Sequence, residues 1–516
     1  MRPGLAGIRK TTVRPQAWRR VGTLGIGAVL AMALAAMTVT LAACDAGSQT
    51  AGGKADGNGN AQVSARADTN ANTNANAGVG RQTSASAAST STVASTVKVT
   101  AHEAGQTRAQ VFESVRQMTA LGKQLFFDAS LSGSGKLACA SCHSPDHGFS
   151  PANSLSVQLG GNDMHRTGMR AAPTLKYLQS VPAFAEHYHE SDDEGDESVD
   201  AGPTGGLTWD GRVDRGSDQA RIPLLSSFEM GSTPAKVTAA VKAAPYAEAF
   251  RTAFGAHIFD SDDATFNAVL QALETFEQAP EIFYPYTSKY DAYLAGKAQL
   301  TKAELHGLEV FNDEKKGNCA SCHISQRTMD GAPPQFSDFG LIAIGVPRNR
   351  ALASNRDPAH FDLGLCGPDR NDLARHADFC GAFITPTLRN VATRRSFFHN
   401  GAFHSLRDVM AFYVERDTRP ARWYPRNADG SVRKYDDLPP AYRDNVNSEV
   451  PFKPAEAGRP RLSAREIDDV IAYLKTLTDG YIVPTNRAET NPVAALSPPA
   501  SSRIHKAGAS FHEKQD

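Results

Sequence analysis

The sequence predicts an all-α fold in which one helical unit occurs twice and long loops join the helices. Two capping boxes, Thr301–Glu304 and Ser463–Glu466, each precede apolar residues at helical spacing. Residues 111–127 and 265–278 show the same spacing, and the alternating patterns that would indicate strands are rare. The helix that follows Ser463 is expected to continue to Gly480, because glycine commonly ends a helix.

The repeat is visible as three pairs of similar segments. Gly122-x-x-Leu125-Phe126 resembles Gly307-x-x-Val310-Phe311, Ala172–Lys176 resembles Thr385–Arg389, and Trp209–Gly211 resembles His399–Gly401. Similarity of this kind indicates one supersecondary unit that has been used twice. We expect the two units to join near residues 285–300.

The composition indicates a soluble globular protein preceded by an export segment. The chain has 516 residues, of which 41% are hydrophobic and 21% are charged, as in ordinary globular proteins. Six of its 54 basic residues and none of its 55 acidic residues lie in residues 1–43, so the remainder is acidic overall. This argues against nucleic acid as a partner, because nucleic-acid binding requires a basic face.

Residues 1–43 have the pattern of a lipoprotein signal peptide. A basic stretch ends at Arg20, an apolar run follows, and Leu41-Ala42-Ala43-Cys44 resembles a bacterial lipobox. Cleavage before Cys44 would leave a cysteine that carries lipid, so we expect a periplasmic protein with a lipid anchor in a membrane. Asp45 favours the inner membrane. The alternative is an uncleaved membrane helix, since about 20 apolar residues can span a bilayer.

Low-complexity segments flank the predicted domains. Residues 44–100 are almost entirely Ala, Ser, Thr, Asn and Gly, which cannot bury enough apolar surface to offset the entropy of chain ordering. We expect a disordered tether there and a disordered tail over residues 486–516. Between them the repeat predicts two domains, residues 101–295 and 296–485.

One short motif occurs once in each unit. Its copies are Cys139-Ala-Ser-Cys142-His143 and Cys319-Ala-Ser-Cys322-His323. Cys-x-x-Cys-His is the attachment pattern of c-type haem, in which the thiols form thioethers with the vinyl groups and the histidine binds the iron. A zinc site or a thioredoxin-like pair would also use two cysteines, but neither requires the trailing histidine in both copies. The sequence therefore predicts two covalently attached haem c groups.

The chain resembles the bacterial dihaem cytochrome c peroxidase and MauG family over roughly residues 108–480. The segments that carry the resemblance are Leu121–Asp128, both Cys-x-x-Cys-His motifs, Trp209–Arg212, Pro386–Val391 and His399–Gly401. The resemblance implies two cytochrome c-like haem domains in tandem. The N-terminal domain would be peroxidatic, and the C-terminal domain would transfer electrons.

The resemblance also implies a peroxide pocket at the first haem. Gln219, Pro223 and Glu229 match the family spacing of Gln, Pro and Glu in this pocket. Glu229 would be the acid and base that moves a proton between the two peroxide oxygens, and Gln219 would orient the peroxide. Without that spacing, a surface or helix-capping carboxylate would be the preferred interpretation of Glu229. Trp209 matches a tryptophan between the haems, and Arg212 would pair with a haem propionate or a carboxylate.

The second haem iron has two candidate distal ligands. The ligand of the family lies fourteen residues after the histidine of the His-x-Gly segment, and counting from His399 gives Tyr413. The peroxidase branch of the family has methionine at this position, and the MauG branch has tyrosine. Met410 lies one turn earlier and would substitute after a local shift.

Two departures from the family pattern limit what the resemblance implies. Ala171 stands where the family has an asparagine that helps to bind calcium between the haems, which argues against calcium here. Some members close the first haem with a histidine on a loop. His165 lies in that region but out of register, so we expect it to be a surface histidine.

Two further features concern export and the loops. Cys366 and Cys380 bracket a loop, and in an oxidising compartment we expect a disulfide, which would stabilise the fold by about 3 kcal/mol in the chain-entropy model. His187 and His189 with the acidic run 190–200 could hold a metal, but a solvated insertion is favoured.

The leading hypothesis is a peroxidase that reduces hydrogen peroxide to water with electrons from a small cytochrome c or copper protein. The first alternative, which Tyr413 favours, is a MauG-like enzyme that oxidises tyrosine or tryptophan residues of a partner protein through a high-valent state of both haems. The second alternative is a non-catalytic electron carrier, which would not need Glu229 or Gln219.

Overall fold

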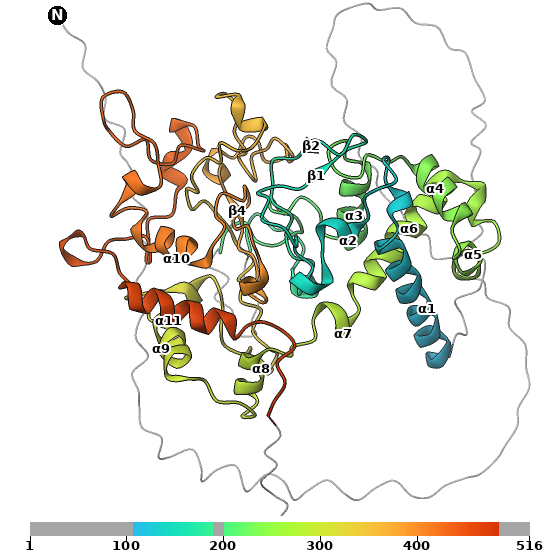
Figure 1. Ribbon diagram of the computed structural model, residues 1–516, viewed down its shortest axis with the longest axis horizontal. Coiled ribbons are helices and arrows are strands. Elements are labelled where there is room, and N and C mark those ends of the chain that lie inside the picture. The colour runs from blue at the N-terminus through green and yellow to red at the C-terminus, as the bar shows by residue number, and fades with distance from the viewer. Residues whose placement is uncertain (1–106, 189–200, 485–516) are drawn as a thin grey trace, which may run out of the picture. The chain divides into compact units, whose positions relative to one another are not determined.

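The computed structural model describes residues 107–188 and 201–484, and it is mostly helical within them (Figure 1). The helices are α1 (Arg108–Phe126), α2 (Cys139–Cys142), α3 (Gly216–Leu225), α4 (Pro234–Ala243), α5 (Ala247–Phe254), α6 (Asp262–Glu277), α7 (Pro280–Phe283), α8 (Lys289–Leu294), α9 (Lys302–Asn312), α10 (Leu406–Glu415) and α11 (Ala464–Lys475). The helical class is confirmed, whereas the tandem of cytochrome c-like domains and its boundaries stay predictions.

The helix starts follow the capping chemistry of the sequence. The Thr301 hydroxyl accepts the Glu304 backbone N–H and the Glu304 carboxylate accepts the Thr301 backbone N–H, so the capping box of α9 is complete. Ser463 and Glu466 do the same at α11. A further capping box at Thr107 starts α1 at Arg108, three residues before the periodic apolar residues begin.

The end of α11 differs from the prediction, because the helix stops at Lys475 and not at Gly480. After that point the chain is held by the Pro386–Val391 segment. The Asn390 backbone N–H donates to the Leu477 carbonyl at 3.0 Å, and the Asp479 backbone N–H donates to the Asn390 side-chain oxygen at 2.9 Å. These tertiary hydrogen bonds end the helix before the glycine is reached.

Strands are few and short in the described residues. β1 (Leu159–Gly160) pairs with β2 (Arg166–Thr167), and β3 (Leu341–Ile342) pairs with β4 (Phe383–Ile384), both antiparallel. Irregular loops make up most of the other described residues (Figure 1).

The core consists of two large hydrophobic clusters, one on either side of residue 285. The first runs from Leu121 to Phe283 and the second from Tyr290 to Leu477. We call the described residues before 285 the N-terminal half and those after it the C-terminal half. A long helix pair crosses in each half, α1 with α6 and α9 with α11.

The same glycine contact allows both crossings. A Cβ on Gly122 would overlap the Ala272 carbonyl oxygen of α6, and a Cβ on Gly307 would overlap the Asp469 carbonyl oxygen of α11. Each glycine therefore lets two helix backbones approach closely. The paired Gly-x-x-apolar-Phe segments of the sequence thus occupy equivalent positions in the two halves.

Buried ion pairs and hydrogen bonds join the two halves. Lys176 of the N-terminal half contacts Asp479 at 2.8 Å, and the Tyr177 hydroxyl donates to the same carboxylate at 2.6 Å. Arg170 forms an ion pair with Asp362 at 2.7 Å. The walls of any cavity at this junction are consequently built from both halves.

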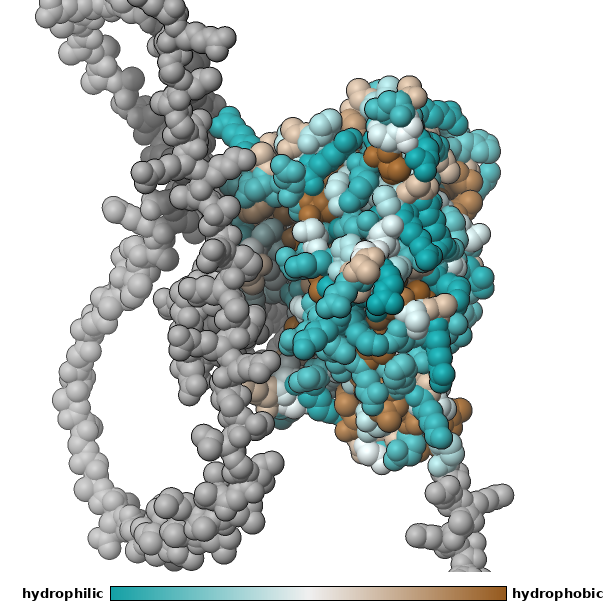
Figure 2. Space-filling model, turned by 90° about the vertical axis from the view of Figure 1, so that its left-hand side faces the viewer, coloured by the Kyte–Doolittle hydropathy of each residue, from teal (hydrophilic) through white to brown (hydrophobic). Residues whose placement is uncertain are grey.

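None of the described helices is long and apolar enough to cross a membrane. The face shown in Figure 2 is largely hydrophilic, with small separate hydrophobic patches. The predicted signal peptide, the predicted lipid attachment at Cys44, the predicted tether and the predicted tail over 486–516 lie outside the described residues.

Candidate active site

The first Cys-x-x-Cys-His motif forms a single helical turn. Cys139–Cys142 is helix α2, and the Ser141 hydroxyl accepts the Ala138 backbone N–H at 3.0 Å. His143 follows the helix, and its Nδ1 lies 3.0 Å from the Phe149 carbonyl oxygen. A carbonyl can only accept, so Nδ1 carries the proton and Nε2 keeps a free lone pair. This tautomer is the one that a metal-binding histidine requires.

The second motif repeats this arrangement. Cys319–Ser321 forms a 3₁₀ turn, and Nδ1 of His323 lies 2.9 Å from the Phe336 carbonyl oxygen. Burial lowers the pKa of His143 to about 4 and also lowers the pKa of His323, so both imidazoles are neutral at pH 7. The four motif cysteines form no disulfide.

Both motifs line one cavity of about 750 Å³ at the junction of the two halves. Its lining is predominantly apolar and includes the four thiols, both histidines, Trp209, Glu229 and Tyr413. An apolar cavity with two thiol pairs and two neutral imidazoles suits two large planar ring systems that are attached through sulfur and ligated by nitrogen. The residues present therefore fit two haem c groups.

The structure brings Gln219, Pro223 and Glu229 together at the first motif. Gln219 and Pro223 lie on α3, Glu229 follows on the turn after the helix, and all three line the cavity. Pro223 has no N–H to donate to the Gln219 carbonyl four residues earlier, which weakens this end of α3. Two backbone hydrogen bonds hold the turn: Met230 N–H donates to the Pro223 carbonyl at 3.0 Å, and Gly161 N–H donates to the Glu229 carbonyl at 2.7 Å.

The carboxyl group of Glu229 is in an environment that favours its protonated form. Burial raises the pKa of Glu229 above its ordinary value, although the nearby Ser226 hydroxyl and the charge of Arg212 oppose this shift. The Glu229 side chain keeps accessible surface, and it lines the cavity. A carboxyl group at a cavity wall can take up a proton from a bound molecule and release it again.

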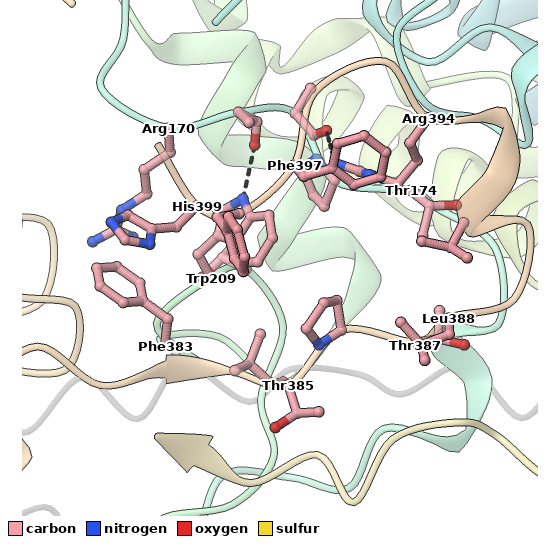
Figure 3. A pocket seen from close by; sticks show the side chains of 18 of the residues that line it. Arg170, Thr174, Trp209, Phe383, Thr385, Thr387, Leu388, Arg394, Phe397 and His399 are labelled. Carbon is pink, nitrogen blue, oxygen red and sulfur yellow. Dashed lines mark hydrogen bonds between the residues drawn. The ribbon is translucent and has the colours of Figure 1, made fainter. Parts of the chain in front are cut away.

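Trp209 is buried in the wall of the cavity that both motifs line. Its indole N–H donates to the Ala171 carbonyl at 2.7 Å, and only 7% of its surface is exposed. Figure 3 shows its ring near the centre of the cavity wall, with His399 beside it. The His399 ring is stacked on Phe383 with 3.6 Å between ring centroids. Trp209 and His399 both line the cavity, so the two matching segments of the repeat that contain them face the same cavity.

Both candidate ligands for the second haem line the cavity. Tyr413 and Met410 lie on α10, three residues apart and thus on one face of the helix. Burial, with the neighbouring Cys322 and Cys319, raises the pKa of Tyr413 above its ordinary value. Tyr413 stacks on Phe452 at 5.2 Å between ring centroids, which holds the phenol ring in place. The assignment of Tyr413 as the distal ligand stays a prediction.

The structure also describes the surroundings of Arg212, His165, Cys366 and Cys380. Arg212 pairs with carboxylates, because its guanidinium lies 2.9 Å from Asp210 and 3.3 Å from Asp369. His165 is exposed on the turn between β1 and β2 and is not part of the cavity lining. Cys366 and Cys380 are joined by a disulfide with 5.0 Å between their Cα atoms.

Two expectations about metals other than iron stay open. Ala171 offers only its backbone to a calcium ion, and its carbonyl already accepts the Trp209 indole. The acidic run 190–200 and His189 lie outside the described residues, so the metal interpretation of that insertion is not tested. No group of three or more His, Cys, Asp or Glu suited to a metal occurs in the described parts of the chain.

The lining includes charged residues that were not expected from the sequence, and Glu277 and Arg394 are two of them. Glu277, the last residue of α6, makes no ion pair with another described residue, and burial raises its pKa to about 8. Arg394 comes from the loop after Pro386–Val391 (Figure 3). Neither has a sequence signal, because a glutamate at a helix end and an arginine in an Arg-Arg pair are usually solvated.

Comparisons with known proteins agree with this geometry. Residues 116–299 match the family model described as di-haem cytochrome c peroxidase. The methylamine utilization protein MauG of Paracoccus denitrificans is 31% identical over 395 residues, covering 73% of this chain and 92% of that protein. The cytochrome c551 peroxidase of Nitrosomonas europaea is 27% identical, covering 61% of this chain and 78% of that protein.

A solved structure is similar as well. The dihaem peroxidase BthA from Burkholderia thailandensis has a TM-score of 0.62 and 37% identity, covering 72% of this chain and 88% of that chain. The chain belongs to the dihaem cytochrome c peroxidase and MauG family. It is an oxidoreductase with peroxidase-type activity and two covalently bound haem c groups.

Proposed function

We propose that this protein reduces hydrogen peroxide to water at its first haem site with electrons from a small redox protein. The observation that carries the proposal is that Glu229 and Gln219 share the cavity lining with His143 and the first pair of thiols. A simple electron carrier does not need a proton-transferring group at a ligand cavity. An open cavity would also admit solvent to the haem of a carrier and promote side reactions.

Each haem supplies one-electron redox chemistry at its iron, and the first also supplies the place where peroxide binds. His143 would bind the iron of this haem through Nε2, because its Nδ1–H is bound to the Phe149 carbonyl. Glu229 takes the proton from one peroxide oxygen and delivers it to the leaving oxygen. Gln219 donates a hydrogen bond that orients the peroxide. Reduction to two water molecules consumes two electrons and two further protons.

Electrons from the donor enter in the C-terminal half and pass Trp209. The indole ring is fixed by its hydrogen bond to Ala171 and lies in the wall that both motifs share. The hydrophilic face in Figure 2 supports a transient donor such as a small cytochrome c or copper protein. Electron-transfer complexes bury little surface and must dissociate quickly, so they do not need a large apolar contact.

One observation favours a second function, the MauG-like oxidation of tyrosine or tryptophan residues in a partner protein. Tyr413 lines the cavity beside Cys319 and Cys322, where an oxygen donor would favour a more oxidised iron. The 31% identity with MauG supports the same reading.

The test is to mix the fully oxidised protein with hydrogen peroxide and no donor, and to follow both irons by EPR and Mössbauer spectroscopy. The peroxidase proposal expects no reaction until one electron per molecule has been added, after which peroxide is consumed. A long-lived change of both irons in the oxidised protein would instead establish the MauG-like function. No reaction in either state would leave an electron carrier and overturn both proposals.

We further propose that the protein is exported to the periplasm and held at a membrane by lipid on Cys44. The basic, apolar and small-residue pattern that ends at Cys44 supports this. Fractionation of cells that express the full chain would test it. The wild type should remain in the membrane fraction. The Cys44→Ser variant should carry no lipid, and its signal peptide should not be cleaved before residue 44. An unmodified Cys44 in the mature protein, shown by mass spectrometry, would refute the anchor.

A further inference from the structure

Most arginines that are buried in the described parts of the chain are paired with an aspartate. Five arginine side chains with less than 10% exposure each form an ion pair with an aspartate. They are Arg170, Arg348, Arg370, Arg389 and Arg416, paired with Asp362, Asp437, Asp372, Asp291 and Asp417. The pattern is expected, because a buried guanidinium without an anion has lost its hydration without compensation.

Arg394, which is half-buried and lines the cavity, has no such partner. Its guanidinium donates to the Ser150 hydroxyl at 3.2 Å and to the Ala172 carbonyl at 3.3 Å, and both acceptors are neutral. No carboxylate of the described residues forms an ion pair with it. Burial lowers the pKa of Arg394 to about 10, which still leaves the side chain positively charged at pH 7. At least three of its five N–H donors have no protein acceptor among the described residues.

The free donors of Arg394 belong to a side chain that lines the haem cavity. Arg394 follows the 3₁₀ turn Val391–Thr393 of the C-terminal half, and both of its acceptors belong to the N-terminal half. Figure 3 shows it on the same side of the cavity as Thr174, above Trp209. One of these acceptors, Ser150, directly follows Phe149, whose carbonyl accepts the Nδ1–H of His143, so Arg394 lies beside the first motif.

Two other arginines of the lining already have carboxylate partners in the protein. Arg170 is bound to Asp362 and Asp210, each at 2.7 Å. Arg212 is bound to Asp210 and Asp369. An anion in the cavity near His143 could therefore form an ion pair with Arg394, because no carboxylate of the described residues is already paired with this guanidinium.

The occupant of the cavity supplies such an anion. Haem carries two propionate side chains, and a guanidinium fork matches a carboxylate in shape and charge. We propose that Arg394 forms an ion pair with a propionate of the haem attached at Cys139, Cys142 and His143, and that it raises the reduction potential of this haem. A fixed positive charge stabilises the reduced state, which has one positive charge fewer than the oxidised state.

This role makes Arg394 a positioning residue supplied by one half to the haem of the other. The guanidinium bridges Ser150, Ala172 and the propionate, so the first haem is held by residues of both halves. The interpretation differs from that of a structural clamp, because a clamp between Ser150 and Ala172 would not change a haem potential.

The test is a redox titration of the purified dihaem protein in three variants, Arg394→Gln, Arg394→Lys and Arg395→Gln. Arg395 is the matched control, because it is the next residue, carries the same charge and is exposed. We expect Arg394→Gln to lower the midpoint potential of the N-terminal haem so that its oxidised-to-reduced ratio at a given potential rises about tenfold, which is about 59 mV for one electron. Arg394→Lys should restore most of the potential, and Arg395→Gln should leave it unchanged.

Resonance Raman spectroscopy gives a second measurement that does not depend on turnover. The propionate bending band of the N-terminal haem should shift in Arg394→Gln and not in Arg395→Gln. Unchanged potential and band in Arg394→Gln, a change confined to the C-terminal haem, or an equal change in Arg395→Gln would each overturn the proposal. If Arg394→Gln fails to incorporate the first haem, the Raman band of Arg394→Lys decides, and an unshifted band there would overturn it.

Discussion

The two haem-attachment motifs of this protein are nearly identical, whereas the residues that share the cavity with each motif differ. Both histidines donate Nδ1–H to a backbone carbonyl, at 3.0 Å for His143 and 2.9 Å for His323, and both are neutral through burial. The α3 turn brings a carboxyl and a carboxamide to the first motif. Helix α10 brings a phenol and a thioether to the second.

This difference separates attachment from reactivity. The repeated residues hold an iron in each half, and they do so in the same way. Under the proposed function, the residues that are not repeated decide what each iron does: Glu229 would transfer a proton at the first site, and Tyr413 or Met410 would be a ligand at the second. One structural unit can therefore provide a reaction site and an electron relay.

The largest effect on activity is expected from removing the proton-transferring group of the first site. Glu229→Gln keeps the shape of the side chain and removes its acid–base function, so peroxide turnover should fall by about 10²–10⁴-fold. Wild-type turnover should rise with pH through values above the ordinary glutamate pKa of 4.5, because the base form is populated only above the raised pKa. Steady-state peroxide consumption from pH 4 to 9 measures both effects.

The control for that variant is Glu281→Gln, an exposed glutamate that does not line the cavity. It should show wild-type turnover at every pH. Both haem spectra of Glu229→Gln should stay close to those of the wild type. Normal turnover in Glu229→Gln would remove this residue from the mechanism.

The second site is tested by exchanging its two candidate ligands. Tyr413→Met should raise the midpoint potential of the C-terminal haem on the order of 0.1 V, since axial ligands span about 0.8 V and methionine lies toward the high end. Met410→Leu should leave that potential unchanged if Tyr413 is the ligand. A redox titration that shows the opposite pair of results would assign the ligand to Met410 and weaken the MauG-like alternative.

The structural equivalence of the halves is tested at the two helix crossings. Gly122→Ala and Gly307→Ala each place a methyl group against a backbone carbonyl of the partner helix, which should cost about 1–3 kcal/mol of unfolding free energy. Denaturant unfolding of the holoprotein measures this cost. Gln124→Ala on α1 and Glu309→Ala on α9 are exposed controls and should change it by less than about 0.5 kcal/mol. A tolerated alanine at only one glycine would show that the halves pack differently.

A further effect, on the pH dependence of stability, is expected at Glu277 of the N-terminal half. Its pKa is about 4.5 in the unfolded chain and is raised to about 8 by burial, so the folded state holds the proton while the unfolded state releases it. Stability should therefore fall as pH rises from about 4.5 to 8 and level off above 8. Glu277→Gln should remove this loss and raise the melting temperature relative to the wild type at pH 8, and it should leave the melting temperature unchanged at pH 4.

The smallest effect is expected from removing calcium. Ala171 has no side-chain ligand, and the positively charged Arg394 lies against the neighbouring Ala172 carbonyl, which disfavours a divalent cation there. Incubation with EGTA should leave both haem potentials and peroxide turnover unchanged. A loss that added calcium reverses would show that a calcium site joins the halves in spite of Ala171.

The sequence predicted the helices and the attachment chemistry because both are local. A capping box needs only residues three apart, as at Thr301 and Glu304, and Cys-x-x-Cys-His places thiols and imidazole within one turn. The predicted end of α11 was wrong because its cause is a hydrogen bond between Asn390 and the chain 87 residues later, at Leu477. No local pattern contains that information.

The sequence by itself determined that the protein carries two haem c groups on a repeated helical unit, since these properties follow from short motifs and their spacing. Only the tertiary structure decided which charges near the haems are compensated. Arg212 and Arg394 look alike in the sequence, yet one is bound to Asp210 and Asp369 and the other meets only neutral oxygens. The physical reason is that the electrostatic free energy of a buried charge depends on groups from distant segments, which folding brings together and which no spacing along the chain records.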